Sequence, residues 1–149
     1  MVKQKLNFIA EIGINHNGDF DLARKHIDAA KEAGATTVKM QNYYAETRVP
    51  KDSPIFSILK DCELPPEKIH DLKLYSESLK INFASTPFCT KSAKDLISMG
   101  CETIKVASFH LNDQELLKCI LEGTGVKTMI VSTGASKFSE IESANNFYE

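Results

Sequence analysis

The sequence predicts an α/β protein built around a parallel sheet, and two observations support this prediction. Short apolar runs alternate with helix-like stretches along the 149 residues, as is typical of parallel strands joined by helical crossovers. Five of these runs end in a polar or charged cluster, and in chain order they are AEIG, VKMQ, ASTPF, KVAS and VSTG. Because the carboxyl ends of parallel strands meet at one edge, we expect these clusters to share one site.

The first two units lie in residues 7–41. A strand is predicted over residues 7–13, and a helix with apolar residues at helical spacing is predicted over residues 19–34. The second strand is predicted over residues 36–41. Residues 42–64 show no regular pattern and contain two prolines, so a long connection is expected there. Loops of this length in a compact domain tend to be functional.

The remaining units repeat the same pattern, with glycine or proline at most boundaries. The predicted elements are a helix over residues 65–80, a strand over 81–88, a helix over 91–99, a strand over 103–108, a helix from 112 or 113 to 123, a strand over 127–134 and a helix over 136–149.

This order of elements fits either an open doubly wound sheet or part of a closed (β/α)8 barrel of the TIM type. Polar residues at every strand end favour the barrel, because an open sheet usually places its site near one switch point. The first strand-to-helix loop, NHNG, also lacks the G-x-G-x-x-G turn of nucleotide-binding folds. A closed barrel needs about 250 residues. Residues 1–149 are therefore predicted to supply only about the first five of eight β/α units.

The composition argues against several classes of partner. The net charge is -2 with acids and bases interspersed, so no positive field is available for a nucleic acid. No stretch approaches the roughly 18 apolar residues of a membrane span. Glu11 interrupts the first apolar run, so no leader peptide is expected. We therefore predict a cytoplasmic protein whose four cysteines, which form no C-x-x-C pair, are reduced.

Two lysines are the first candidate site residues. Lys39 and Gln41 are two residues apart on one strand, so their side chains project from the same face. Lys105 is embedded between apolar residues of the fourth strand. Either lysine alone is compatible with a strand-end side chain that reaches out to water. Two lysines at equivalent positions of adjacent strands repel each other unless an anion lies between them, which favours an anion site.

Hydroxyl groups at the strand ends suit a phosphate or carboxylate ligand, although each alone is also a common helix cap. These residues are Ser85, Thr86, Ser108, Ser132 and Thr133. Ser108 lies three positions past Lys105, so it serves the same site only if the strand has already turned.

Glu11 and two histidines complete the candidates. Glu11 is either a structural partner of a lysine or a general acid or base. His110 begins the loop after the fourth strand, close enough to the rim to contact a substrate. His16, in the first loop, is expected to bond its own backbone rather than to carry a proton. A single histidine at the rim cannot make a metal site.

The motifs AEIGINHNG, VKMQ, FASTPF, KVAS and VSTG, in this order and spacing, resemble the sialic acid synthase family. That family includes N-acetylneuraminate, legionaminic acid and pseudaminic acid synthases, which condense phosphoenolpyruvate with an N-acetylated amino sugar and release phosphate. The resemblance covers essentially the whole chain and implies a TIM-type barrel and a transferase that makes a nonulosonic acid. The alternatives are a Schiff-base aldolase and a non-catalytic anion-binding half-barrel.

The resemblance implies a phosphoenolpyruvate site built from five positions. Lys39 and Lys105 correspond to the two lysines that bind phosphoenolpyruvate in the family. Thr86, Ser108 and Ser132 correspond to the residues that complete that site. Their types suit the chemistry, because the departing phosphate needs cations and hydroxyl donors around it.

For the sugar, the resemblance implies Gln41 as a contact and Glu11 as the acid–base residue. Ser85 and His110 remain further substrate-binding candidates. Many family members carry an acid at the place of His110. They also usually have aspartate and methionine where this chain has Cys89 and Ala135, so the resemblance leaves the identity of the sugar open.

The resemblance also implies components outside this chain. The family uses a divalent metal, manganese or magnesium, whose histidine ligands lie in the later part of the barrel, so no metal ligand is expected here. An antifreeze-like domain that reaches into a neighbouring subunit's site follows the barrel, which implies a homodimer of the full-length form. We therefore expect an N-terminal part of such a synthase, inactive alone, whose partners are phosphoenolpyruvate and an amino sugar rather than nucleic acid or membrane.

Overall fold

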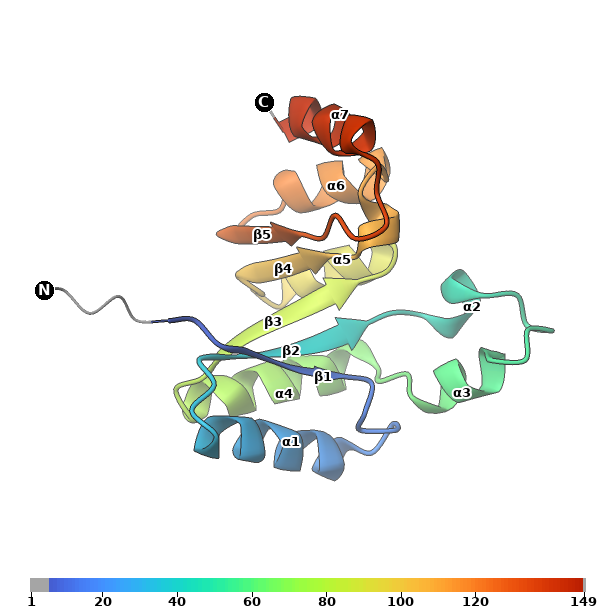
Figure 1. The fold of residues 1–149 in the computed structure, drawn as a ribbon. Helices are drawn as coiled ribbons and strands as arrows, with labels where there is room; N and C mark the ends of the chain where they lie inside the picture. Colours follow the sequence, from blue (N-terminus) through green and yellow to red (C-terminus); the bar gives the residue numbers. More distant parts are fainter. Residues whose placement is uncertain (1–5, 149) are drawn as a thin grey trace, which may run out of the picture.

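The centre of the molecule is one sheet of five parallel strands in the order β1-β2-β3-β4-β5 (Figure 1). The structure is a computed structural model that describes residues 6–148, with side chains up to residue 145. The strands are β1 (Ile9–Gly13), β2 (Thr37–Asn42), β3 (Asn82–Pro87), β4 (Thr103–Val106) and β5 (Thr128–Val131). Neighbours in the sheet are neighbours in the chain, so the five predicted β/α units are confirmed.

Each strand is followed by a long helix, as predicted. These helices are α1 (Phe20–Glu32), α4 (Pro66–Ser78), α5 (Thr90–Ser98), α6 (Gln114–Leu121) and α7 (Phe138–Tyr148). Side-chain caps set three of the starts, where Asp19, Cys89 and Asp113 accept a hydrogen bond from the N–H of Leu22, Ser92 and Leu116 respectively. Glu149, the predicted end of the last helix, and residues 1–5, which bear on the leader-peptide prediction, lie outside the described residues.

The long connection predicted over residues 42–64 is more regular than expected. It contains two short helices, α2 (Ala45–Arg48) and α3 (Phe56–Asp61), which extend beyond the carboxyl ends of the strands (Figure 1). The backbone N–H of Ala45 donates to Glu63 Oε2 at 2.7 Å, which ties the two ends of the connection together. Helices of four and six residues have no apolar repeat to read, so periodicity alone misses them.

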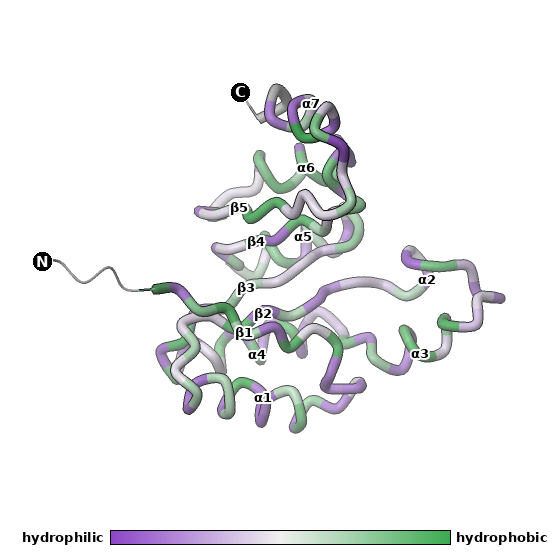
Figure 2. Tube along the Cα trace, in the orientation of Figure 1, coloured by the Kyte–Doolittle hydropathy of each residue, from purple (hydrophilic) through white to green (hydrophobic). Residues whose placement is uncertain are grey.

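The pleat of the strands sends their side chains to two faces. Val38, Met40, Ile104 and Val106 point to the helix layer and are fully buried in the main core. Each such burial stabilises the fold by about 1.5–3 kcal/mol. Figure 2 shows hydrophobic residues recurring along the strands, with hydrophilic residues between them on β1 and β2. The intervening residues form the second face, which carries the candidate site.

The loop after β1 packs against the end of α3 through a glycine. Gly18 has a φ of +78°, and a Cβ atom there would lie 2.0 Å from the backbone oxygen of Asp61. Gly34 has a comparable φ of +84°, but a Cβ there would meet no atom within 4 Å. Gly18 therefore lets the first loop and the α3 segment approach each other closely.

We expect Gly18→Ala to destabilise the fold more than Gly34→Ala. Both substitutions strain a left-handed backbone, at a cost of about 1–2 kcal/mol. Only Gly18→Ala also forces two backbone segments apart, adding about 1–3 kcal/mol. Urea unfolding of the two variants measures this difference in the free energy of unfolding. Equal losses would show that the contact with Asp61 is not a tight one.

Candidate functional site

Lys39 is the centre of a polar group on the second face of the sheet. Its ammonium forms an ion pair with the Glu11 carboxylate of β1 and donates a hydrogen bond to Thr86 Oγ1 of β3 at 3.1 Å. The strand register produces this arrangement, because Glu11 is paired with Lys39 and Gln41 is paired with Thr86. The Lys39 side chain is only 12% exposed, so it does not extend into water as a strand-end lysine would.

Glu11 and Gln41 converge beside a bulge in β1. A Cβ atom at Gly13, whose φ is +58°, would lie 3.3 Å from Glu11 Oε1 and 3.4 Å from Gln41 Nε2. The glycine therefore leaves room for the carboxylate and the amide side by side. The Glu11 side chain is 48% exposed, so its carboxylate is accessible although it is paired with Lys39. Glu11 was expected either to pair with a lysine or to act as a general acid or base, and the structure shows the ion pair with Lys39.

Lys105 lies on the same face of β4. β3 runs between β2 and β4, so the two lysines are not on adjacent strands as the sequence suggested. Burial lowers the pKa of the Lys105 ammonium, the charge of Lys39 lowers it further, and Glu11 opposes both. The expected repulsion between the lysines is therefore present across the intervening strand, whose Thr86 stands on the same face.

Ser108 reaches the rim because β4 ends two residues earlier than predicted. The strand stops at Val106, and residues 108–110 form a 3₁₀ turn, η1 (Ser108–His110). The strand has thus turned before Ser108, which was the condition for its use in the site. A Cβ at Gly134 would lie 3.8 Å from Ser108 Cβ and 4.0 Å from its Oγ. The Ser132 N–H donates to the Val106 oxygen at 3.1 Å, which holds the S-T-G loop beside η1.

Ser85 is a correction to the predicted site. It is paired with Met40 in the sheet, so its side chain points to the helix layer and is fully buried. Its Oγ has no hydrogen-bond partner in the described part of the chain. The alternation of strand residues, applied to S-T-P, would have separated Ser85 from Thr86. Thr133 is exposed in the loop after β5, where its carbonyl accepts a hydrogen bond from Ser136.

The histidines are placed largely as predicted. His110 Nδ1 lies 2.9 Å from Asp113 Oδ2, so its imidazole is held at the start of α6, beside the rim. His16 Nδ1 accepts a hydrogen bond from the Gly18 N–H at 3.1 Å, which confirms a role in its own loop. Its burial, which lowers the pKa of the imidazole, was not predicted. Of the two helical histidines, His70 is exposed and His26 is half-buried.

A cluster of aromatic rings around Arg48 was missed. The Arg48 guanidinium carbon lies 3.6 Å from the centre of the Phe88 ring, 5.6 Å from that of Tyr43 and 5.8 Å from that of Phe109. The Phe88 and Phe109 rings are stacked, with centres 5.8 Å apart. A signal was available, because an aromatic residue directly follows β2 and β3 and another lies three residues after the end of β4.

The described residues contain no group of three or more His, Cys, Asp or Glu side chains that could hold a metal ion. The site itself offers two ammonium groups, hydroxyls, an amide and one carboxylate already paired with Lys39. This donor set does not fit a divalent cation, which takes several free oxygen or imidazole ligands. The four cysteines are free thiols, as expected. No helix in the described part is long and apolar enough to span a bilayer.

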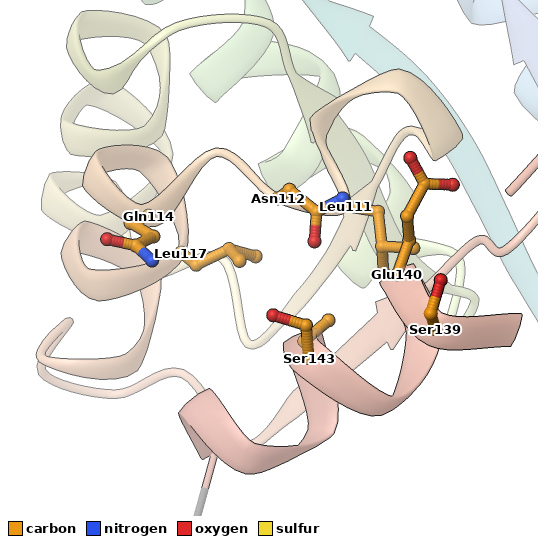
Figure 3. A pocket seen from close by; sticks show the side chains of 8 residues that line it. Leu111, Asn112, Gln114, Leu117, Ser139, Glu140 and Ser143 are labelled. Atoms are coloured by element: carbon orange, nitrogen blue, oxygen red, sulfur yellow. The ribbon is translucent and has the colours of Figure 1, made fainter. Parts of the chain in front are cut away.

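A separate hollow of about 210 Å³ lies between the start of α6 and α7 (Figure 3). It is lined by Leu111, Asn112, Gln114, Leu117, Ser139, Glu140, Ser143 and Ala144. None of the predicted site residues lines it. Asn112 and Glu140 also line a neighbouring hollow that touches Ser108.

Comparison with known proteins identifies what this chain is similar to. The model of the NeuB family matches residues 26–149. An N,N'-diacetyllegionaminic acid synthase from Legionella pneumophila is 35% identical over 151 residues, which cover 91% of this chain and 42% of that protein. The chain spans about two fifths of the length of the first curated relatives that it matches.

Solved structures agree on the fold. The N-acetylneuraminic acid synthetase of Leptospira borgpetersenii serovar Hardjo-bovis, crystallised with citrate, superposes with a TM-score of 0.89 at 33% identity. The match covers 95% of this chain and 49% of that one. A truncated 3-deoxy-D-arabino-heptulosonate 7-phosphate synthase from Thermotoga maritima superposes with a TM-score of 0.68 at 10% identity, over 95% of this chain and 45% of that one. The predicted TIM-type fold class is confirmed.

We expect Glu11→Gln to lower the pKa of Lys105 further. The carboxylate favours the charged form of the lysine, so its removal leaves the repulsion from Lys39 less opposed. Glu102→Gln is the matched control, because Glu102 pairs with Lys127, 2.7 Å away, at the other end of the sheet. A pH titration of the lysine side chains by carbon-detected NMR reports both variants. An unchanged or raised pKa in Glu11→Gln would contradict the electrostatic account.

Proposed function

Because this chain belongs to the NeuB family, we propose that it forms the phosphoenolpyruvate-binding part of a nonulosonic acid synthase. The Legionella and Leptospira relatives are named for the synthesis of legionaminic and neuraminic acids. The proposed reaction joins phosphoenolpyruvate to an N-acetylated amino sugar and releases phosphate. One observation supports it above the others: Lys39 and Lys105 share a face of the sheet with Thr86 between them.

The charge balance of this face favours an anionic ligand. Two ammonium groups face one carboxylate, and the pKa of Lys105 is depressed by burial and by Lys39. An anion between the lysines would offset their repulsion and favour the charged form of both. The hydroxyls of Thr86, Ser108 and Ser132 supply neutral donors around the same anion.

In the proposed reaction, carbon 3 of phosphoenolpyruvate attacks the aldehyde carbon of the open-chain sugar and forms the new carbon–carbon bond. The aldehyde oxygen takes up a proton, and carbon 2 becomes an oxocarbenium-like centre. Water adds its oxygen to carbon 2 and loses a proton, and phosphate leaves by cleavage of the carbon–oxygen bond. The lysines stabilise the charge of the phosphate throughout, because their ammonium groups are already in place before the reaction.

Glu11 and Gln41 act on the sugar side of this scheme. When a phosphate group replaces Glu11 as the ion-pair partner of Lys39, the Glu11 carboxylate becomes free. That carboxylate is accessible and lies beside the Gln41 amide. The carboxylate then holds or transfers a proton at the aldehyde oxygen, and the amide orients a sugar hydroxyl. Both roles follow from the space that Gly13 leaves open.

The rest of the proposed enzyme lies outside these residues. We propose that the remaining strands of the barrel, the ligands of a manganese or magnesium ion, and an antifreeze-like domain from a second subunit complete the site, as the family resemblance implies. When bound, such an ion would supply a Lewis acid for the aldehyde. The described residues alone are then expected to bind phosphoenolpyruvate weakly and without turnover.

One observation favours a second function. A half-buried lysine with a lowered pKa beside another cation is also the environment of a Schiff-base nucleophile, and Lys105 has those features. An aldolase would use its neutral amine to attack the carbonyl of a ketone substrate. The ion pair between Lys39 and Glu11 has no clear role in an aldolase mechanism, so the synthase is the preferred function.

We expect Lys39→Ala and Lys105→Ala each to weaken phosphoenolpyruvate binding roughly 10- to 100-fold. Each removes a charge-assisted hydrogen bond, which contributes about 1.5–3 kcal/mol. Lys118→Ala is the control, since its exposed ammonium lies on α6 at 3.9 Å from Glu122. Isothermal titration calorimetry at neutral pH measures the dissociation constants. If either site variant bound phosphoenolpyruvate with wild-type affinity, the proposed anion site would be contradicted.

Borohydride treatment with pyruvate is expected to leave Lys105 unmodified. A synthase of the proposed kind forms no imine, whereas a Schiff-base aldolase would be trapped as a reduced adduct on the lysine. Mass spectrometry of the intact chain and of its peptides reads the result. An adduct present in the wild type and absent in Lys105→Arg would favour the aldolase instead.

A further inference from the structure

The loop between β1 and α1 is a tight segment held by His16. Gly13, Asn17 and Gly18 have positive φ angles of +58°, +50° and +78°. Such left-handed conformations are uncommon, so a loop with several of them needs contacts that hold it. His16 is 1% exposed, and its Nδ1 atom accepts the Gly18 N–H at 3.1 Å. That bond fixes Gly18 in the position from which it contacts the backbone of Asp61.

Both ring nitrogens of His16 favour the neutral imidazole over the charged one. Because the Gly18 N–H donates to Nδ1, that atom cannot carry a proton while the bond exists. The neutral ring therefore carries its proton on Nε2, which is buried and has no hydrogen-bond partner in the part of the chain that the structure describes. A second proton, on Nδ1, would point at the Gly18 N–H and break the bond. Protonation of His16 and the observed loop thus exclude each other.

The surroundings of His16 act in the same direction. Burial lowers the pKa of its imidazole, His26 of α1 lowers it further, and Asp19, the cap of α1, raises it. The Nε2 atom of His26 is also buried and without a partner among the described residues. The end of α3 meets the loop at Gly18 through backbone atoms of Asp61 and Cys62. The one acid that acts on His16 is therefore outweighed by burial and by a second imidazole.

We propose that His16 is a pH-sensitive latch: its neutral imidazole holds the loop after β1 closed, and its protonation releases the Gly18 N–H and frees the loop from the end of α3. Above about pH 6.5 the imidazole is neutral whether the loop is closed or open, so the closed loop keeps its full stability. As the pH falls below that value, the open loop binds a proton that the closed loop does not accept, so the equilibrium shifts towards opening.

The latch adjoins the candidate site. Gly13, which leaves room for Glu11 and Gln41, directly precedes this loop, so opening is expected to alter the space between those two side chains. An effect of pH on ligand binding rests on the proposed function, whereas the latch itself does not. The test below therefore contains no phosphoenolpyruvate, and failure of the proposed function would leave its outcome unchanged.

Hydrogen exchange of the backbone amides, followed by NMR from about pH 8 to about pH 5, tests the latch. The protection factor of the Gly18 amide, which corrects for the intrinsic pH dependence of exchange, is compared with that of Met40 in the core. His16→Asn is the informative variant, because an asparagine oxygen accepts the N–H two residues on and is not protonated in this range. His70→Asn, at an exposed position of α4, is the matched control. Proton–nitrogen correlation spectra of the imidazoles report which nitrogens of His16 carry a proton.

In the wild type we expect the Gly18 protection factor to fall below about pH 6.5, by at most about tenfold per pH unit, while that of Met40 holds. Over the same range His16 should change from protonation on Nε2 alone to protonation on both nitrogens. His16→Asn should abolish the fall at Gly18, and His70→Asn should keep it.

Three results would overturn the latch. These are a Gly18 protection factor that does not change with pH, a doubly protonated His16 while Gly18 stays protected, and a simultaneous loss of protection at Gly18 and Met40, which would mean global unfolding. If His16→Asn does not fold, the wild-type comparison of Gly18 protection with the protonation of His16 still decides between these results and the expected one.

Discussion

The ammonium of Lys39 lies between Glu11 and Thr86 because the pairing of β1, β2 and β3 places Glu11 opposite Lys39 and Thr86 opposite Gln41. The same register sends Val38 and Met40 of β2 to the helix layer. A shift of one residue in β2 would exchange the two faces, burying Lys39 among the helices and exposing Met40. The hydrophobic core and the charged face are thus fixed by one constraint, since burying an unpaired lysine costs far more than any single apolar contact provides.

The parts of the fold that rest on apolar periodicity could be predicted from the sequence. The strands and long helices have enough residues to show a repeat, whereas α2 and α3 are too short to show one. The face on which a side chain lies was predicted correctly where strand alternation was applied, as for Lys39 and Gln41. It was not applied to Ser85, which is buried on the helix side. β4 ends at Val106 because the chain turns into η1, and no local sequence pattern predicts that turn.

The electrostatics of the charged face and of the Arg48 cluster differ in kind. Lys39 is paired with Glu11, and these two charges act in opposite directions on the pKa of Lys105, which burial also lowers. Arg48 is stabilised instead by aromatic faces, and burial lowers its pKa without bringing the guanidinium near neutrality. The charged face therefore combines charges of both signs, whereas the Arg48 guanidinium lies against aromatic rings.

The strand order β1-β2-β3-β4-β5 has a consequence for how the chain acquires its structure during synthesis. Each strand pairs with the one made just before it, so a newly emerged β/α unit finds its docking edge already present. Contacts between elements close in sequence form faster than distant ones, because less chain entropy is lost in closing the intervening loop. These five strands can therefore assemble outward from β1 while the ribosome is still translating, one unit at a time.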